Sequence, residues 1–157
     1  MLKVGLVWAS QPLATRIAPL KSLELEMLAP LRAVAGVRFY SLQMGSARIG
    51  ARAVVPPLAM TDLAAGIHDF SDTAAAIANL DLTISVDTAA AHLAGALGTP
   101  VWTLLQYTPD WRWHPDADTS RWYPTMRLYR QPRRGDWAAV IARVAVDLQR
   151  LRATSPT

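Results

Sequence analysis

Cysteine is absent from the chain, which excludes disulfide bonds, thiol nucleophiles and zinc sites built on cysteine ligands. No apolar run approaches the roughly 18 residues that a membrane-spanning helix needs, and residues 1–8 lead into a predicted strand instead of a signal peptide. Charged residues are few, at 18% against 52% hydrophobic residues. We therefore expect one globular, cytoplasmic domain over residues 1–152, with a frayed tail at 153–157.

Lysine is nearly missing as well, with two lysines against 14 arginines and a formal net charge of +4. A basic surface suits nucleic acid, and it equally suits a ligand that carries a diphosphate. RNA binding ranks last, because no RNA-binding signature accompanies the arginines and aromatics between Arg112 and Arg134. No helix carries histidine and carboxylate residues at a spacing that indicates a metal site.

The most informative stretch reads LDLTISVDTAAAHLAGALGTPVWTLL. It predicts a strand over 82–86, a turn at 87–88, a helix of small residues over 89–97 that Gly98 ends, and a second strand over 101–105. Both strands are almost continuously apolar, which is typical of a parallel sheet covered on both faces. The stretch therefore predicts a β-α-β unit with a right-handed crossover.

The turn inside this unit is the main candidate site. Ligands of open α/β sheets bind beyond the carboxyl ends of the strands, where helix N-termini present free N–H groups. Asp87 and Thr88 lie there, and the small side chains of Ala89 and Ala90 would let a phosphate approach the backbone. His92 falls one helical turn after Thr88, on the same side. An N-capping role for Asp87 or Thr88, with alanines that only pack, stays open at this point.

The first strand is predicted at 3–8, so the loop over 9–20 reaches the same edge of the sheet and is expected to be irregular because of its two prolines. Candidates for ligand contact in and after it are Ser10, Gln11, Thr15, Arg16 and Lys21. Further strands are predicted at 37–43, 67–70 and 126–130, with one short helix near 47–53. Helix caps are expected at Ser22, at Ser71 or Asp72 ahead of a helix over 73–79, and at Asp136, while His68 and Asp69 are assigned a structural role.

Residues 107–122 form the most aromatic segment of the chain. They could stack on bases or sugar rings, or they could plug the end of the sheet. The residues concerned are Trp111, Trp113 and Trp122, with Tyr123 directly after the segment, interleaved with Arg112 and Arg121.

The segments DFSDTAAAIANLDLTIS and DTAAAHLAGALGTPVW resemble the nucleotide-sugar-binding half of glycosyltransferase family 9, the heptosyltransferase family. The resemblance extends through KVGLVW, GVRFYSLQ, PDWRW, WYP, MRLYRQ and GDW, and it is strongest to the branch usually fused to tetratricopeptide repeats. That family carries an Asp-Thr-(Gly/Ala)-x-x-His-Leu-Ala signature after the fourth strand of its C-terminal Rossmann-like domain.

The resemblance implies the C-terminal half of a GT-B glycosyltransferase, a Rossmann-like, doubly wound α/β fold. Its sheet would have six mostly parallel strands in the order 3-2-1-4-5-6, covered by helices on both faces. The ligand would be a nucleotide-diphosphate sugar, used without a cofactor or a metal in an inverting transfer. The acceptor and the catalytic base would come largely from an N-terminal half, so no residue here is assigned to catalysis.

The resemblance also implies roles for single residues. Lys21 would neutralise the donor diphosphate, Thr88 with the amides of Ala89 and Ala90 would hold phosphate, and Asp87 would orient the sugar. His92 would bind phosphate or brace the loop, and the site-edge candidates are Ser10, Gln11, Trp111 and Trp113.

A second hypothesis is a non-catalytic binding or oligomerisation module that keeps the fold without the activity. Such a module would pair with another protein or with a second copy through the face that normally meets the N-terminal half. Exposed apolar side chains around Trp111 and Trp113 would support it.

Overall fold

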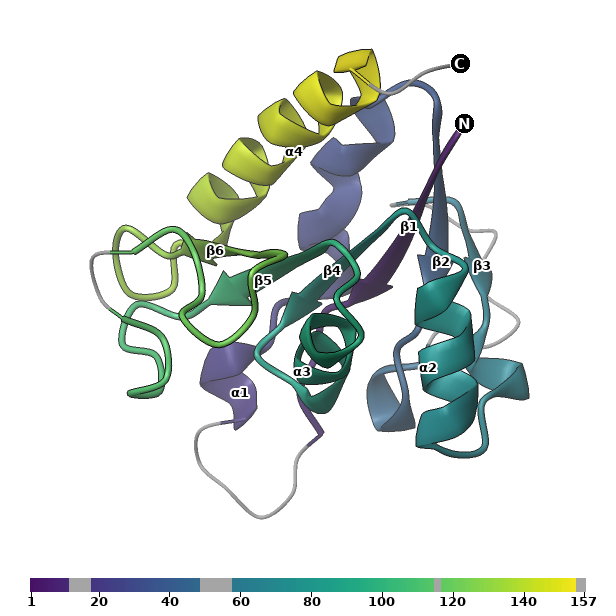
Figure 1. Cartoon of the computed structure of the whole chain (residues 1–157). Helices are drawn as coiled ribbons and strands as arrows, with labels where there is room; N and C mark the ends of the chain where they lie inside the picture. Colours follow the sequence, from purple (N-terminus) through teal and green to yellow (C-terminus); the bar gives the residue numbers. More distant parts are fainter. Residues whose placement is uncertain (12–17, 49–57, 115–116, 155–157) are drawn as a thin grey trace.

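The computed structural model describes residues 1–11, 18–48, 58–114 and 117–154. One six-stranded sheet lies at its centre, with helices on both faces (Figure 1). The strands are β1 (Leu2–Val7), β2 (Val37–Ser41), β3 (Met60–Asp62), β4 (Leu82–Val86), β5 (Val101–Leu105) and β6 (Met126–Arg130). The α-helices are α1 (Ala18–Lys21), α2 (Phe70–Ala78), α3 (Ala89–Ala96) and α4 (Trp137–Thr154), and the 3-10 helices are η1 (Leu25–Ala33), η2 (Gly45–Ala47) and η4 (Ala64–Gly66).

Every neighbouring pair of strands is parallel, and the order across the sheet is β3-β2-β1-β4-β5-β6. The order reverses between β1 and β4, where Val4 stands opposite Leu82. Chain segments leave these two strands toward opposite halves of the sheet, so their loops border a crevice at its carboxyl edge. The predicted Rossmann-like α/β fold and its strand order are confirmed, with a sheet that is parallel throughout.

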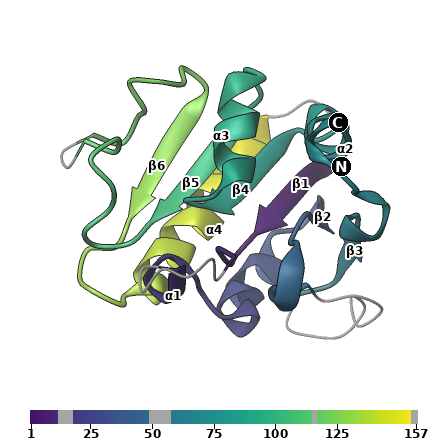
Figure 2. The same ribbon diagram turned by 90° about the horizontal axis from the view of Figure 1, so that it is seen from below.

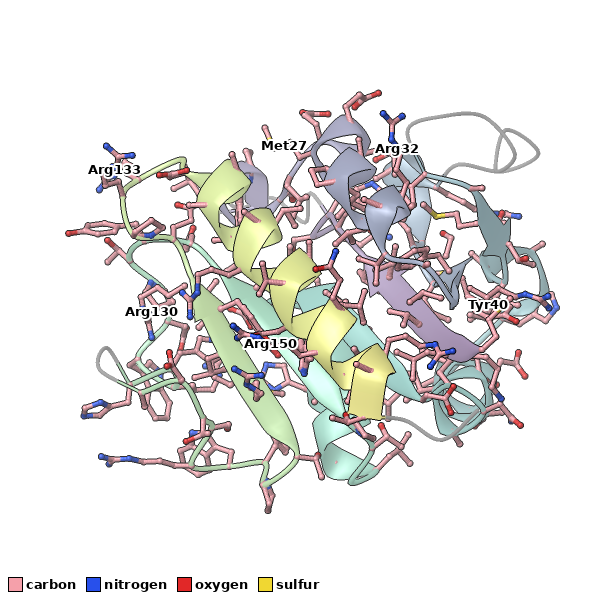
Figure 3. All side chains as sticks on the ribbon, turned by 90° about the horizontal axis from the view of Figure 1, so that it is seen from above. Met27, Arg32, Tyr40, Arg130, Arg133 and Arg150 are labelled. Carbon is pink, nitrogen blue, oxygen red and sulfur yellow. The ribbon has the colours of Figure 1, made fainter. Side chains whose placement is uncertain are left out.

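Two apolar layers cover the sheet, one on each face. On one face η1 and α4 lie side by side (Figure 3) and bury Leu31 and Val144 against the strands. On the other face α2 and α3 (Figure 2) bury Ile77 and Ala94. Burial from both sides explains why every residue of β4 and β5 is buried and most of them are apolar.

The second half of the sheet follows the sequence prediction closely. β4, β5 and β6 begin and end at the predicted residues, and α3 ends one residue earlier than predicted. Gly98 adopts a φ of 70° in the turn after α3, a conformation that favours glycine. Asp136 caps α4 as predicted, accepting a hydrogen bond from the Ala139 N–H at 3.1 Å, and α4 continues to Thr154, beyond the expected end of the domain at 152.

The prediction for the third strand is wrong. β3 lies at Met60–Asp62, while the expected strand over 67–70 begins just after η4 and ends at the first residue of α2. Asp69 is the reason, because its carboxylate accepts hydrogen bonds from the N–H groups of Ser71 and Asp72 and so starts α2 three residues early. Asp69, and neither Ser71 nor Asp72, is therefore the helix cap.

The segment before β2 also differs from the prediction. Ser22 caps no helix: its Oγ accepts a hydrogen bond from the Ser10 N–H at 2.9 Å, and Glu24 occupies the N-cap position of η1. The loop expected to be irregular ends in one helical turn, α1, with Pro19 in that first turn, where a missing N–H costs nothing. Of the short helix expected near 47–53, Ala47 belongs to η2 and 49–57 lie outside the described residues.

Among the described residues, no helix is both long and apolar enough to cross a bilayer.

Candidate functional site

The loops after β1 and β4 meet at the point where the strand order reverses. There the Lys21 Nζ, at the end of α1, lies 2.7 Å from Oδ2 of Asp87, which directly follows β4. The Lys21 side chain is 23% exposed and that of Asp87 is 10% exposed. Two residues far apart in the sequence therefore form a largely buried ion pair at the edge of the sheet where ligands bind.

The environment of Asp87 keeps its carboxylate ionised. Burial alone would raise the pKa of Asp87, but contacts with His92, Lys21 and Trp113 together outweigh it and lower that pKa to about 2. The site thus holds a fixed negative charge, and a lysine that this charge keeps in place.

His92 connects Asp87 to the aromatic segment. Its Nε2 lies 3.6 Å from Oδ1 of Asp87, and its Nδ1 lies 3.1 Å from the Tyr123 hydroxyl. A carboxylate only accepts hydrogen bonds, so the nitrogen that faces it is Nε2–H, and in the neutral ring Nδ1 then accepts from the Tyr123 hydroxyl. Trp113 stacks on the imidazole, with ring centroids 5.3 Å apart and planes at 25°. His92 therefore braces Asp87.

Gly95 makes this contact between His92 and Tyr123 possible. A methyl group at Gly95 would overlap the Tyr123 ring, so only glycine lets that ring lie against α3. Tyr123 is a site residue that the sequence placed only within the aromatic segment. A glycine in a helix and a tyrosine 28 positions later form no local sequence pattern, so their contact could not be predicted.

The two candidate tryptophans, Trp111 and Trp113, differ in burial. Trp113 is 2% exposed, and its indole faces the Asp87 carboxylate, whereas Trp111 is 77% exposed. Trp111 meets Trp122 edge to face, with centroids 6.2 Å apart. The expectation of exposed apolar side chains around both residues is therefore wrong for Trp113, which plugs the end of the sheet, and holds for Trp111.

The N-terminus of α3 lies beside Asp87. Thr88 occupies the N-cap position, but its hydroxyl pairs with Ser85 at 2.9 Å and makes no capping hydrogen bond. The capping alternative is therefore wrong for the Thr88 side chain. Within the described residues the N–H groups of Ala89 and Ala90 have no hydrogen-bond partner, so two backbone donors stay available next to the ion pair.

The start of the first loop is held by a residue that the sequence did not single out. Gln43 is 2% exposed, and its amide accepts hydrogen bonds from the N–H groups of Trp8 and Ala9 and donates to the Ala9 carbonyl. A glutamine at the end of the predicted strand over 37–43 is the one signal that could have revealed it.

The site-edge candidates in this loop differ from one another. Ser10 is fixed through its N–H to Ser22 and is partly buried, while Gln11 is exposed and lies against Gly45. Thr15 and Arg16 fall outside the described residues. The structure therefore brings together Lys21, Asp87, Thr88, Ala89, Ala90, His92 and Trp113, and leaves Gln11 and Trp111 outside that group.

Comparison with known proteins adds two findings. The chain is 31% identical over 158 residues to Protein FlbA of Caulobacter vibrioides, an alignment that covers 94% of this chain and 25% of FlbA. The chain thus spans about a quarter of the length of that curated relative. Residues 47–135, more than half of the chain, match glycosyltransferase family 9 (heptosyltransferase). The match includes Asp87, His92 and Trp113, and the chain belongs to this glycosyltransferase family.

Proposed function

We propose that the chain binds the diphosphate of a nucleotide-sugar donor for an inverting, metal-independent glycosyl transfer. The observation that carries the proposal is the Lys21–Asp87 ion pair beside the free N–H groups of Ala89 and Ala90. All four groups lie at the carboxyl edge of a parallel sheet, where its strand order reverses.

Lys21 supplies the positive charge. When the glycosidic bond breaks, the leaving nucleoside diphosphate gains negative charge, and a fixed ammonium group beside it stabilises the transition state more than the ground state. In the proposed complex the Lys21 Nζ donates to a phosphate oxygen while it stays near Asp87. The N–H groups of Ala89 and Ala90 donate to the same diphosphate at the positive end of α3. Together they place one ammonium group and two N–H donors on the diphosphate without a metal ion.

Asp87 orients the sugar in this proposal. Its low pKa keeps it an acceptor for sugar hydroxyl groups at neutral pH, and His92, held by Tyr123 and Trp113, fixes the direction of the carboxylate. A hydroxyl group that donates to Asp87 would replace part of the interaction that Lys21 gives up to the diphosphate.

A binding or oligomerisation module is the second candidate. Trp111 and Trp122 are 77% and 58% exposed and lie together on the surface, and a patch of this kind is typical of a contact with another protein or a second copy. In that case association would not depend on nucleotide. The cytoplasmic location and the link to tetratricopeptide repeats stay predictions from the sequence.

Calorimetric titration with ADP, UDP and GDP tests the proposal. The unmodified chain should bind at least one of them, and Lys21→Ala should weaken that binding about tenfold or more, since a charge-assisted hydrogen bond contributes roughly 1.5–3 kcal/mol.

Lys3→Ala is the matched control, because Lys3 is the chain's other lysine and its side chain lies on the surface at the opposite end of β1. It should bind like the unmodified chain. A folded chain that binds none of the three nucleotides would contradict donor binding, and concentration-dependent dimerisation without nucleotide would favour the module.

A further inference from the structure

A small pocket lies next to Lys21 on the side of β5 and β6. Its volume is about 180 Å³, and its walls come from α1 and from the loops that follow β5 and β6. Leu20 of α1 lines it, so the residue adjacent to Lys21 in the sequence forms one wall. The other residues that matter here are Gln106, Tyr107, Gln131 and Arg134.

Gln131 holds the two strand-end loops in place. It is 3% exposed, and its Oε1 accepts hydrogen bonds from the Tyr107 N–H at 3.2 Å and the Gly135 N–H at 2.9 Å. The pocket wall is therefore formed before any ligand arrives, which lowers the entropic cost of binding.

Two polar groups of this pocket, Gln106 Oε1 and the Arg134 guanidinium, lack partners within the described part of the chain. The Gln106 Nε2 donates to the Thr108 carbonyl at 2.9 Å, which leaves Gln106 Oε1 buried with no donor. Arg134 makes no ion pair, unlike its neighbour Arg133, whose guanidinium lies 3.1 Å from the Asp136 carboxylate. A buried amide oxygen without a donor is unfavourable, so a ligand hydroxyl group that donates to it after a rotation of the Gln106 side chain gains affinity.

The Tyr107 side chain is 50% exposed at the pocket. The electron-rich face of an aromatic ring attracts weakly positive hydrogens, and the C–H groups on one face of a sugar ring are of this kind. An aromatic face, an amide acceptor and an unpaired guanidinium together suit a ring that carries several hydroxyl groups.

The size of the pocket selects among the parts of a donor. Pockets for drug-sized ligands measure about 300–1,000 Å³, and at about 180 Å³ this one is too small for a whole nucleoside. We propose that the pocket receives the sugar ring of the donor, with Tyr107 stacking on the ring and with Gln106 and Arg134 binding the hydroxyl groups that point away from Asp87. This inference rests on the proposed function, since Lys21 must hold the attached diphosphate.

The test compares each nucleotide with its sugar conjugate: UDP with UDP-glucose, GDP with GDP-mannose and ADP with ADP-glucose. Gln106→Ala and Arg134→Ala are each titrated with the pair that the unmodified chain binds. Arg133→Ala is the matched control, because it removes the same charge from the same loop outside the pocket, and Arg133 points outward from that loop (Figure 3).

The expected result is a loss of about tenfold in affinity for the conjugate in each pocket variant, with the affinity for the free nucleotide changed less than about twofold. Arg133→Ala should leave both affinities unchanged. Equal losses for nucleotide and conjugate would overturn the inference by assigning the pocket to the nucleoside, and so would pocket variants that change neither affinity. A chain that binds no nucleotide at all contradicts the proposed function first, and this inference falls with it.

Discussion

The Nζ of Lys21 and Oδ2 of Asp87 lie 2.7 Å apart although 66 positions separate them in the sequence. The local sequence around either residue does not predict the contact, because Lys21 lies in the connection after β1 and Asp87 in the connection after β4. The parallel order β1-β4 brings their loops together, and the reversal of strand order opens the crevice between them. The ion pair is thus a product of topology, and its two charges define the candidate site.

The first prediction concerns stability in acid. Because the pKa of Asp87 falls from 3.8 to about 2 on folding, its carboxylate stabilises the folded chain above pH 4 by about 2 kcal/mol. This contribution is lost as the pH falls from 4 toward 2, where the folded-state group takes up its proton. The difference in unfolding free energy between the unmodified chain and Asp87→Asn should shrink by about that amount from pH 5 to pH 2, measured by urea unfolding.

Asp118→Asn is the control for this series, because it removes a carboxylate that is 79% exposed. Its difference from the unmodified chain should stay nearly constant over the same range. Parallel curves for Asp87→Asn would show that the environment of Asp87 does not stabilise its charge.

The second prediction concerns the tautomer of His92. In the neutral ring, the contact of Nε2 with Asp87 and of Nδ1 with the Tyr123 hydroxyl favours the Nε2–H tautomer. Nitrogen-15 NMR of the neutral imidazole should therefore show a protonated Nε2 and an unprotonated Nδ1. Tyr123→Phe should move the Nδ1 signal and lower stability by about 1 kcal/mol, as expected for one lost hydrogen bond. A neutral ring with its proton on Nδ1 would contradict this arrangement.

Much of the sheet could be predicted from the sequence because burial from two sides leaves an unmistakable pattern. β4 and β5 are short, mostly apolar runs bounded by turns, β6 combines buried residues with arginines, and the predicted limits of all three strands are those observed. β3 could not be found, since it has three residues and one exposed side chain in Met-Thr-Asp, and the more apolar Ile67 nearby misled the prediction. Short edge strands are fixed by their neighbours, and their own sequence says little.

For the candidate site, the local signals identified single residues and the fold supplied their contacts. Asp87, Thr88 and His92 follow from the turn and the helix after β4. Lys21 followed from its place after the first loop, and the family resemblance added its role toward the diphosphate. The aromatic segment gave no means of telling buried Trp113 from exposed Trp111, because that difference depends on which ring stacks on His92. Tyr123 and Gln43 were missed as supporting residues for the same reason, since their partners lie far away in the sequence.

The third prediction tests the helix cap that Asp69 forms at the start of α2. Asp69→Ala removes two hydrogen bonds to backbone N–H groups and should lower stability by about 1 kcal/mol, within the 0.5–2 kcal/mol typical of a lost cap. The melting temperature should drop by about 2–4 °C. Ser71→Ala is the control, because Ser71 offers the cap only its backbone N–H, and it should melt like the unmodified chain. A larger loss of stability in Ser71→Ala than in Asp69→Ala would show that Ser71 caps α2, as the sequence predicted.

The fourth prediction separates support of the first loop from contact with the ligand. Gln43 joins the end of β1 to the loop after β2 through four hydrogen bonds, to the N–H groups of Trp8 and Ala9 and to the carbonyls of Ala9 and Met44. Gln43→Leu leaves these backbone groups unpaired and should cost at least about 3 kcal/mol, since each unpaired buried group costs roughly 1–3 kcal/mol.

The same variant should weaken nucleotide binding, because the Trp8 carbonyl accepts the Leu23 N–H at 2.9 Å and so links this loop to the segment just after Lys21. Gln11→Ala is the control, since Gln11 is an exposed glutamine of the same loop. The Gln11→Ala variant should keep its full stability, measured by urea unfolding. Its affinity for the nucleotide, measured by calorimetry, then decides the role of Gln11. An unchanged affinity removes Gln11 from the site edge, whereas a loss of affinity at unchanged stability makes it a direct ligand contact. If Gln43→Leu were to bind nucleotide with full affinity while losing stability, the position of Lys21 would not depend on this hydrogen-bond network, and the ion pair with Asp87 alone would hold it.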